Sequence, residues 1–240
     1  MITEDALLAK LHARTACLIN FADHRFILDA SGALVWPRHD MVVFSDLHFE
    51  KGSFLSQFAN PLPRFDTAKT ITNMQNVLQE YNPKQVICLG DSLHDGNALS
   101  RMNNRDLSDI NDLVRGVNAW FWVLGNHDPE MPDAILGQSS EYYEIDNILW
   151  VHEPENLTRF ANATAQVIGH FHPKLSVKKA RHRMTGKCFV STENILLMPA
   201  FGQYTGGLWV EDEAIQSLLQ DPYQTHLLFN NKLYSTGIKA

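Results

Sequence analysis

The sequence predicts an α/β protein in which two mixed β-sheets form a sandwich flanked by helices. Short apolar runs rich in Val, Ile, Phe and Trp recur along the chain and end at Gly, Pro, Asp or Asn, as buried strands do. Two amphipathic segments separate the first three of these runs. Strands that alternate with helices favour an α/β arrangement.

The elements follow from these patterns in chain order. We predict strands at 41–45, 85–89, 121–124, 148–151, 166–169 and 194–200. A helix is predicted over 67–81, where apolar residues recur at helical spacing before an Asn-Pro stop, and a second over 105–117. The strands lie closer together after about residue 148, which indicates a more antiparallel second sheet. No linker or low-complexity tract stands out, so 1–240 is expected to be one domain.

Composition narrows the class of protein. No stretch approaches the ~20 apolar residues that cross a bilayer, and the first residues lack the pattern of a signal peptide. We therefore expect no membrane association. The three cysteines, Cys17, Cys88 and Cys188, are far apart and odd in number, which argues against a disulfide framework and for a reducing cytoplasm. Cys88 reads as a small core residue.

Charge is distributed unevenly along the chain. The formal net charge is −7, which argues against a protein that coats nucleic acid by charge alone. Residues 156–192, however, hold seven Lys and Arg and no Asp or Glu, so the rest of the chain carries −14. This basic block is a candidate substrate-steering surface.

Polar clusters follow five of the apolar runs. A tight turn would explain Gly-Asn-His-Asp at 125–128, and a single His at a strand end is more often structural than functional. Five clusters at the carboxyl ends of strands instead favour a common site, because these ends meet at one crevice in open α/β sheets. The clusters contain Asp46 and His48; Asp91, His94 and Asp95; Asn126, His127 and Asp128; His152; and His170 and His172.

These residue types indicate a metal centre. Carboxylate, imidazole and amide groups without thiolates suit Mn²⁺, Fe²⁺ or Zn²⁺. In Asp-x-His and His-x-His, alternate side chains of an extended segment reach one side. The ligands suffice for two metals ~3.5–4 Å apart that share a carboxylate. Asn126 would supply an amide oxygen, His127 would stay free to donate a proton, and Asp128 would orient it.

The ordered motifs Asp46-x-His48, Gly90-Asp91-x-x-His94, Gly125-Asn126-His127-Asp128, His152 and Gly169-His170-x-His172 resemble the calcineurin-like metallophosphoesterase superfamily. The stretches SDLHFEKGSF, LPRFDTAKT, GHFHPK and LMPAFGQYTGG are similar to one branch, the ligase-associated DNA-damage-response endonucleases (PdeM), formerly grouped as ICC-like phosphoesterases. This resemblance covers residues 45–207. The sequence departs from the family pattern at two positions. Residue 94 is His where many members have Asp, and no Gly precedes His152. Neither departure removes a ligand.

The resemblance implies a role for each motif residue. Asp46, His48, Asp91 and His172 would surround one metal. Asp91 would bridge to a second metal held by Asn126, His152 and His170. His127 would be the general acid or would stabilise charge on the phosphoryl group, and His94 and Asp128 would orient the site. Two divalent ions are expected, with Mn²⁺ first and Fe, Zn or Mg as alternatives.

The expected activity is metal-dependent phosphodiester hydrolysis, in which His127 protonates the leaving alkoxide. By resemblance the substrate is a nucleic-acid phosphodiester, namely single-stranded DNA during repair, with DNA-repair proteins or a second copy of the chain as conceivable partners. The alternative substrates are a small nucleotide or a phosphomonoester. A non-catalytic scaffold of the same fold is the rival class, but such scaffolds lose ligands or the general-acid His, and all are present here.

Substrate contacts are predicted beside this centre. Glu50 and Lys51 either face the substrate or lie on a solvated surface. The segment 174–190 reads as a hairpin with Thr185 and Gly186 in its turn, and a solvated surface is again the alternative reading. The basic residues proposed to bind substrate in this segment are Lys174, Lys178, Lys179, Arg181 and Arg183.

Overall fold

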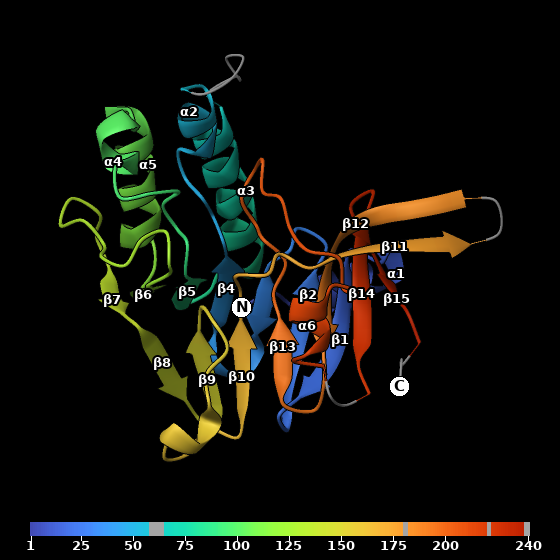
Figure 1. The fold of residues 1–240 in the computed structure, drawn as a ribbon. Coiled ribbons are helices and arrows are strands. Elements are labelled where there is room, and N and C mark those ends of the chain that lie inside the picture. Colours follow the sequence, from blue (N-terminus) through green and yellow to red (C-terminus); the bar gives the residue numbers. More distant parts are fainter. Residues whose placement is uncertain (58–64, 180–181, 220–221, 238–240) are drawn as a thin grey trace.

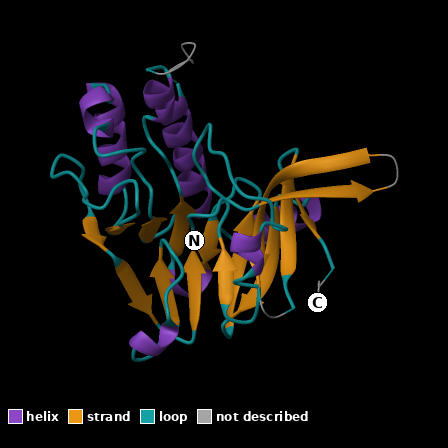
Figure 2. Ribbon diagram, viewed as in Figure 1, coloured by secondary structure: helices purple, strands orange, loops and turns teal. Residues whose placement is uncertain are grey.

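The structure is a computed structural model of the chain and describes residues 1–57, 65–179, 182–219 and 222–237. Two β-sheets pack against each other, and the longer helices stand on the outer side of one of them (Figures 1 and 2). Each sheet contains both parallel and antiparallel pairs. The predicted α/β class, with two mixed sheets flanked by helices, is confirmed.

The first sheet has the strand order β1-β2-β3-β4-β5-β6-β7. Strands β1 to β4 pair antiparallel, whereas β4 to β7 pair parallel. The parallel half contains the first three predicted strands. The bounds are β1 Ala16–Phe21, β2 His24–Asp29, β3 Leu34–Trp36, β4 Met41–Ser45, β5 Gln85–Leu89, β6 Ala119–Val123 and β7 Gln138–Ser140.

The second sheet has the order β15-β14-β12-β13-β10-β9-β8, with β11 paired to β12. Its pairs are antiparallel except those of β10 with β9 and β13, so the predicted antiparallel character holds in part. The bounds are β8 Tyr142–Ile145, β9 Ile148–Val151, β10 Ala165–Ile168, β11 Lys174–Lys179, β12 His182–Ser191, β13 Ile195–Leu197, β14 Gln224–Phe229 and β15 Lys232–Ser235. Strand β13 is shorter than predicted because Pro199 cannot donate to a ladder.

The helices confirm both helical predictions within two residues. Helix α5 stops at Arg115, earlier than predicted, because Gly116 caps it. The bounds are α1 Glu4–Ala13, α2 Lys51–Leu55, α3 Asp66–Tyr81, α4 Ala98–Arg101, α5 Asn104–Arg115 and α6 Glu213–Gln216, with 3-10 turns η1 Pro37–His39 and η2 Leu157–Arg159. No described helix has the length and apolar character needed to cross a membrane.

Successive apolar side chains of the central strands point to opposite faces of the first sheet, so a core forms on both faces. In β4, Val42 and Phe44 pack toward α3 and α5, whereas Met41 and Val43 pack toward the second sheet. Cys88, in β5, is fully buried on the helix side, as predicted. Both faces of the parallel strands are therefore covered, which fixes the register of these strands. The loops that follow them consequently start from fixed positions.

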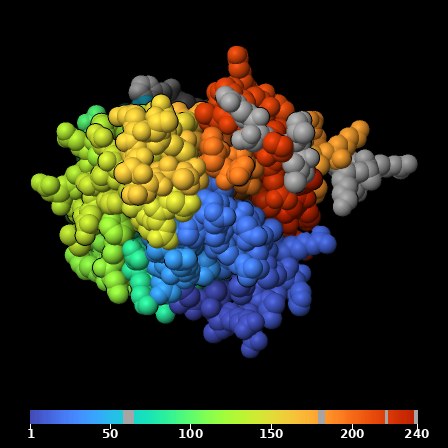
Figure 3. Space-filling model, turned by 90° about the horizontal axis from the view of Figure 1, so that it is seen from below, coloured from blue at the N-terminus to red at the C-terminus, as the bar shows by residue number. Residues whose placement is uncertain are grey.

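The basic hairpin forms, but its turn is not where the sequence suggested. Strands β11 and β12 pair antiparallel from Lys174↔Lys187 to Lys179↔His182, so Thr185 and Gly186 lie inside β12. Gly186 is needed for close approach, not for a turn, because a Cβ there would lie 2.1 Å from the carbonyl oxygen of Leu228. The hairpin projects from the rest of the molecule (Figures 1 and 3).

Candidate metal centre

The five polar clusters do converge. Strands β4, β5 and β6 run parallel in one sheet and β9 and β10 run parallel in the other, and each is followed by one cluster. The carboxyl ends of β4, β9 and β10 point to the same edge of the sandwich (Figure 1). Contacts between side chains or backbone atoms link every cluster to at least one other.

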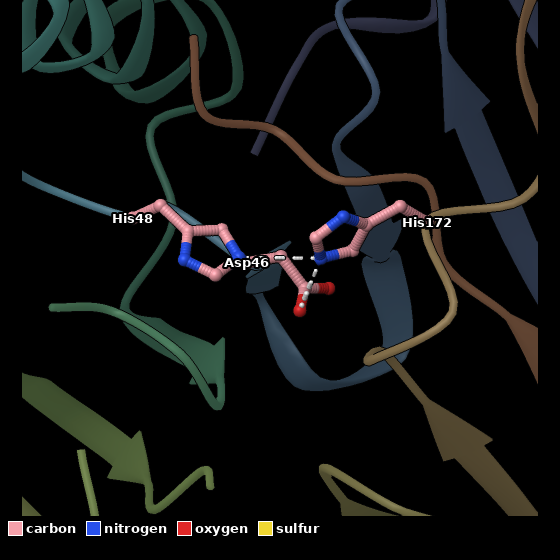
Figure 4. A group of neighbouring side chains, drawn as sticks. All are labelled: Asp46, His48 and His172. Carbon is pink, nitrogen blue, oxygen red and sulfur yellow. Dashed lines mark hydrogen bonds and ion pairs between the residues drawn. The ribbon is translucent and has the colours of Figure 1, made fainter. Parts of the chain in front are cut away.

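The first predicted ligand set forms a compact group. Nε2 of His172 lies 3.0 Å from Oδ1 of Asp46 and 3.3 Å from Nε2 of His48. Nε2 of His48 lies 3.7 Å from Oδ2 of Asp91. Figure 4 shows Asp46 between the two imidazole rings. The ligand atoms of Asp46, His48 and His172 all lie within 4.8 Å of one another, which suits one metal ion.

The second predicted set adjoins the first through Asp91. Nε2 of His152 lies 3.4 Å from Oδ1 of Asp91 and 3.2 Å from the amide oxygen of Asn126. Nδ1 of His170 lies 3.1 Å from the same amide oxygen. Nδ1 of His152 lies 3.2 Å from the carbonyl oxygen of Leu89, so that it can donate there and leave Nε2 free as a ligand.

Asp46 also approaches the second set. One group of ligand atoms within 4.8 Å comprises Asp46, Asp91 and His152, whereas the resemblance assigned Asp46 to the first metal alone. The contact runs to Nδ1 of His152, at 3.9 Å, the nitrogen that faces Leu89. Asp91, which contacts Nε2 atoms in both sets, is therefore the better candidate for a shared carboxylate.

Strained backbone marks five of the seven predicted ligands. A positive φ is uncommon outside glycine, and a left-handed residue of another type costs about 1–3 kcal/mol. In Asp46-x-His48 and His170-x-His172, two such residues are separated by one residue. The five are Asp46 at φ 52°, His48 at 45°, Asp91 at 46°, His170 at 65° and His172 at 47°.

Electrostatics keep both carboxylates in the ligating form. Burial alone would raise the pKa of Asp46 and of Asp91, but the neighbouring histidines hold both pKa values below the ordinary range. Burial lowers the pKa of His48 to about 3, so its imidazole is neutral. Burial opposes protonation of His152 as well, but contact with Asp91 raises its pKa to about 9. A proton on His152 must leave before a cation binds there.

His127 differs from the ligands in exposure and in contacts. Its side chain is 40% exposed, whereas that of His152 is 3% exposed. Nδ1 of His127 lies 2.7 Å from the carbonyl oxygen of His94, and its ring stacks on that of His94 at 5.2 Å. Donation from Nδ1 to this carbonyl leaves Nε2 to face the centre, 3.9 Å from Oδ2 of Asp91. His94 also places Nδ1 3.3 Å from Nδ1 of His48.

Asp128 does not orient His127 as the sequence suggested. Its buried carboxylate accepts backbone hydrogen bonds from Leu93, at 2.9 Å, and from Gly125, at 3.0 Å, so it joins the loops after β5 and β6. Burial raises the pKa of Asp128 to about 7. Gly125 itself is required because a Cβ would lie 2.3 Å from Oδ1 of Asp91.

The first two residues predicted near substrate have different surroundings. Glu50 is buried, and the hydroxyl of Thr67 donates to its Oε1 at 3.0 Å. Its side chain therefore neither lies on a solvated surface nor faces the substrate. Lys51 is half-buried. Burial lowers its pKa, whereas the charges of Asp91 and Asp46 act in the opposite direction.

Those of the predicted basic residues that the structure describes lie along the hairpin. Lys174 begins β11 two residues after His172, and Lys178 and Arg183 are exposed register partners farther along. Nε of Arg183 donates to Ser176 Oγ at 2.8 Å. Lys179 is placed only as the last residue of β11, and Arg181 lies outside the described residues.

Three supporting contacts were missed from the sequence. The hydroxyl of Ser45 donates to Oδ2 of Asp46 at 2.5 Å. Nζ of Lys187 donates to the carbonyl oxygens of Ala200, at 2.7 Å, and Gly202, at 3.0 Å. Gly202 in turn donates its N–H to the carbonyl of Asp46. Lys187 was counted only as part of the basic block. Counting charges does not reveal which atoms its ammonium group contacts.

Asp95, from the GDSLHD cluster, does not join the centre. Its carboxylate forms a two-point contact with the guanidinium of Arg101, which also donates to Ser53 at 3.1 Å. These contacts connect α2 to α4 beside the centre. Phe201, in the LMPAFGQYTGG stretch, donates its N–H to the carbonyl of Ser45 at 2.8 Å and so attaches this stretch to the end of β4.

Comparison with solved structures finds proteins of similar fold. The nuclease MPE of Pseudomonas putida matches with a TM-score of 0.70 and 22% identity, over 92% of this chain and 100% of that one. Yfce, a phosphoesterase from E. coli, matches over 83% of this chain and 99% of that one at 14% identity and a TM-score of 0.41. No curated protein sequence gives a significant match.

The family assignment rests on the sequence model of the calcineurin-like phosphoesterases, which matches residues 40–222. The match begins just before β4 and includes every residue of the candidate metal centre. The chain therefore belongs to the calcineurin-like phosphoesterase family and is a metal-dependent phosphoesterase.

Proposed function

We propose that this phosphoesterase is a dinuclear phosphodiesterase that cleaves nucleic acid, with single-stranded DNA as the substrate. The observation that carries the proposal is the position of Asp91, whose two carboxylate oxygens face His152 and His48 in the two ligand sets. Two adjacent cations clamp the attacking and leaving oxygens of one phosphoryl group. A single structural metal would not need both sets.

The residues present fit such a pair of ions. Oxygen and imidazole nitrogen donors without thiolate suit Mn²⁺, Fe²⁺ or Zn²⁺, and we take Mn²⁺ as the first candidate, with Fe, Zn and Mg as alternatives. Asp46, His48 and His172 would hold one cation and Asn126, His152 and His170 the other, with Asp91 shared. When bound, the cations lower the pKa of water and offset charge on the phosphoryl oxygens.

His127 would supply the proton that the leaving alkoxide needs. Its imidazole is exposed enough to meet substrate, and its Nδ1 is occupied by the His94 carbonyl, so Nε2 is the atom that faces a bound phosphodiester. Proton donation of this kind is worth about 10²–10⁴ in rate. His94 positions two groups at once, His127 through its carbonyl and His48 through its ring.

The substrate class is supported by charge and by one relative's name. The basic hairpin begins two residues from His172, in a chain that is otherwise acidic. A local positive field of this kind attracts a polyanion toward the centre. The structure most similar in fold among those described above is named a nuclease. We infer action in the cytoplasm, alongside DNA-repair proteins.

A substrate panel tests the proposal. The Mn²⁺-loaded protein is assayed in parallel on bis-p-nitrophenyl phosphate, p-nitrophenyl phosphate, a single-stranded oligonucleotide and mononucleotides. We expect diester hydrolysis to exceed monoester hydrolysis and the oligonucleotide to be cut internally. A protein that prefers the monoester or a mononucleotide would contradict the nucleic-acid assignment and favour a small-molecule phosphatase.

A further inference from the structure

The segment after the LMPAFG loop places exposed aromatic side chains beside the metal centre. Leu208 donates its N–H to the carbonyl of Phe171 at 3.1 Å, and Lys174 donates to the carbonyl of Leu208 at 2.8 Å. Trp209 forms a parallel bridge with Lys174. Trp209 is therefore held against a chain that leaves His172 only two residues earlier, and two residues span at most about 7 Å.

Trp209 is exposed by its local structure, not by disorder. Val210, next in sequence, is fully buried. The N–H of Trp209 donates to Oδ2 of Asp212 at 2.6 Å, and its carbonyl accepts from the N–H of Asp212 at 2.9 Å. The backbone is thus fixed on both sides while 41% of Trp209 stays exposed. Tyr204, 46% exposed, lies in the same loop.

Positive charge accompanies these rings. Nζ of Lys174 lies 4.9 Å from the centroid of the Trp209 ring, and the exposed Lys178 and Arg183 continue along the hairpin. On the other side of the centre, a cavity of about 250 Å³ beside Asn126 and His152 is lined by Glu141, Glu153 and Glu155. A polyanion would avoid the acidic side and lie along the basic one.

We propose that Trp209, with Lys174, forms a stacking platform for a base of a single-stranded polynucleotide. The inference rests on the proposed function and names the surface that carries the strand to the metals. Aromatic rings beside a positive groove are the features by which proteins hold single strands without reading sequence. A duplex would not expose its base faces to such a platform.

The chain supplies its own reporter for this proposal. Of the five tryptophans, Trp36, Trp120, Trp122 and Trp150 are at most 3% exposed, so Trp209 alone is accessible to a quencher. Titration with oligothymidylate, in EDTA to stop hydrolysis, is expected to quench its fluorescence. Inorganic polyphosphate, which has charge without bases, is expected to leave the fluorescence unchanged, and a DNA duplex is expected to quench weakly.

Affinity measured by anisotropy of labelled oligothymidylate completes the test. Trp209→Ala should weaken binding about 10-fold, since stacking on one ring has that order of effect, whereas Trp209→Phe should retain most of it. The control is Tyr142→Ala, which removes an aromatic residue of similar exposure, 43%, next to Glu141 on the acidic side. This variant should bind like the unaltered protein.

The outcomes separate this proposal from the proposed function. Bound oligothymidylate without quenching, equal quenching by polyphosphate, or unchanged affinity of Trp209→Ala would overturn the platform, even if bis-p-nitrophenyl phosphate is hydrolysed. Quenching and weakened binding in a protein that hydrolyses no phosphodiester would support the platform and overturn the proposed function instead.

Discussion

The backbone N–H of His127 donates a hydrogen bond of 2.9 Å to Oδ1 of Asp91. The candidate proton donor and the candidate bridging carboxylate are thus joined by a hydrogen bond, although they lie in loops after different strands. The bond fixes the direction of the carboxylate and the start of the His127 side chain together. The bond uses the backbone of His127, so the partly exposed His127 ring and the second carboxylate oxygen of Asp91 are left for the proposed proton transfer and metal binding.

Asp91→Asn should therefore remove the shared ligand. We expect metal content, measured by mass spectrometry after loading, to fall from two ions per chain toward one or none, and phosphodiesterase activity to be lost. Asp95→Asn is the matched control, because Asp95 lies in the same loop but contacts Arg101. Full occupancy with normal turnover in Asp91→Asn would refute the bridging role.

His127→Ala should keep both metals and lose about 10²-fold or more in rate. The loss should shrink along a series of diesters with better leaving groups, because a stable leaving anion needs no proton. The slope of rate against leaving-group pKa is the measurement. If the rate falls equally for every leaving group, His127 acts by binding or charge and not as an acid.

The hairpin charges should control binding of single-stranded DNA through salt-dependent contacts. Replacing Lys178 and Arg183 by Ser removes two cations, so the slope of log affinity against log salt should fall by about 1.4. The control replaces Arg25 and Arg115, which lie near the opposite edge of the first sheet, at the start of β2 and just before β6. Identical slopes in the two double variants would reduce the hairpin to a solvated surface.

His226 should make the fold less stable in acid, independently of the metal centre. Burial lowers its pKa to about 4, its Nδ1 lies 2.8 Å from Ser235 Oγ, and its buried Nε2 has no hydrogen-bond partner among the described residues. Between pH 6.5 and about 4 the unfolded chain binds a proton that the folded chain does not, so stability falls as pH falls through this window.

Denaturant unfolding at pH 7 and pH 4.5 measures this effect. The loss of unfolding free energy attributable to His226 should be on the order of 2 kcal/mol, given 1.36 kcal/mol per pKa unit. His226→Gln removes the titrating group, so its loss between the two pH values should be smaller by that amount. Parallel losses in the two proteins would show that other groups cause the acid sensitivity.

The sequence predicted the central part of the fold well, because β4 and β5 are continuous apolar runs and α3 and α5 have apolar residues at helical spacing. It did not predict β1 to β3, β7, β8, β14 and β15. Edge strands such as β7, with Gln138 and Ser139 exposed, lack the apolar run that marks a buried strand. The hairpin turn was misplaced because Thr-Gly is a turn signal, whereas here Gly186 provides room for the Leu228 carbonyl.

For the site, residue type and spacing identified groups that the structure brings together, since the carboxyl ends of parallel strands meet. What could not be predicted are contacts that depend on distant backbone atoms. The carbonyl of His94, not the carboxylate of Asp128, orients His127. Likewise, Glu50 is buried against Thr67 although its neighbours suggested a surface position.

Two metal ions are proposed to act together on one phosphodiester, and a metal titration separates this from a reaction that needs one ion or none. Metal-free protein is titrated with Mn²⁺ while hydrolysis of bis-p-nitrophenyl phosphate and bound metal are measured on the same samples. We expect no activity without metal and a maximum only when two equivalents per chain are bound. Full activity at one equivalent, or hydrolysis that persists without metal, would contradict it.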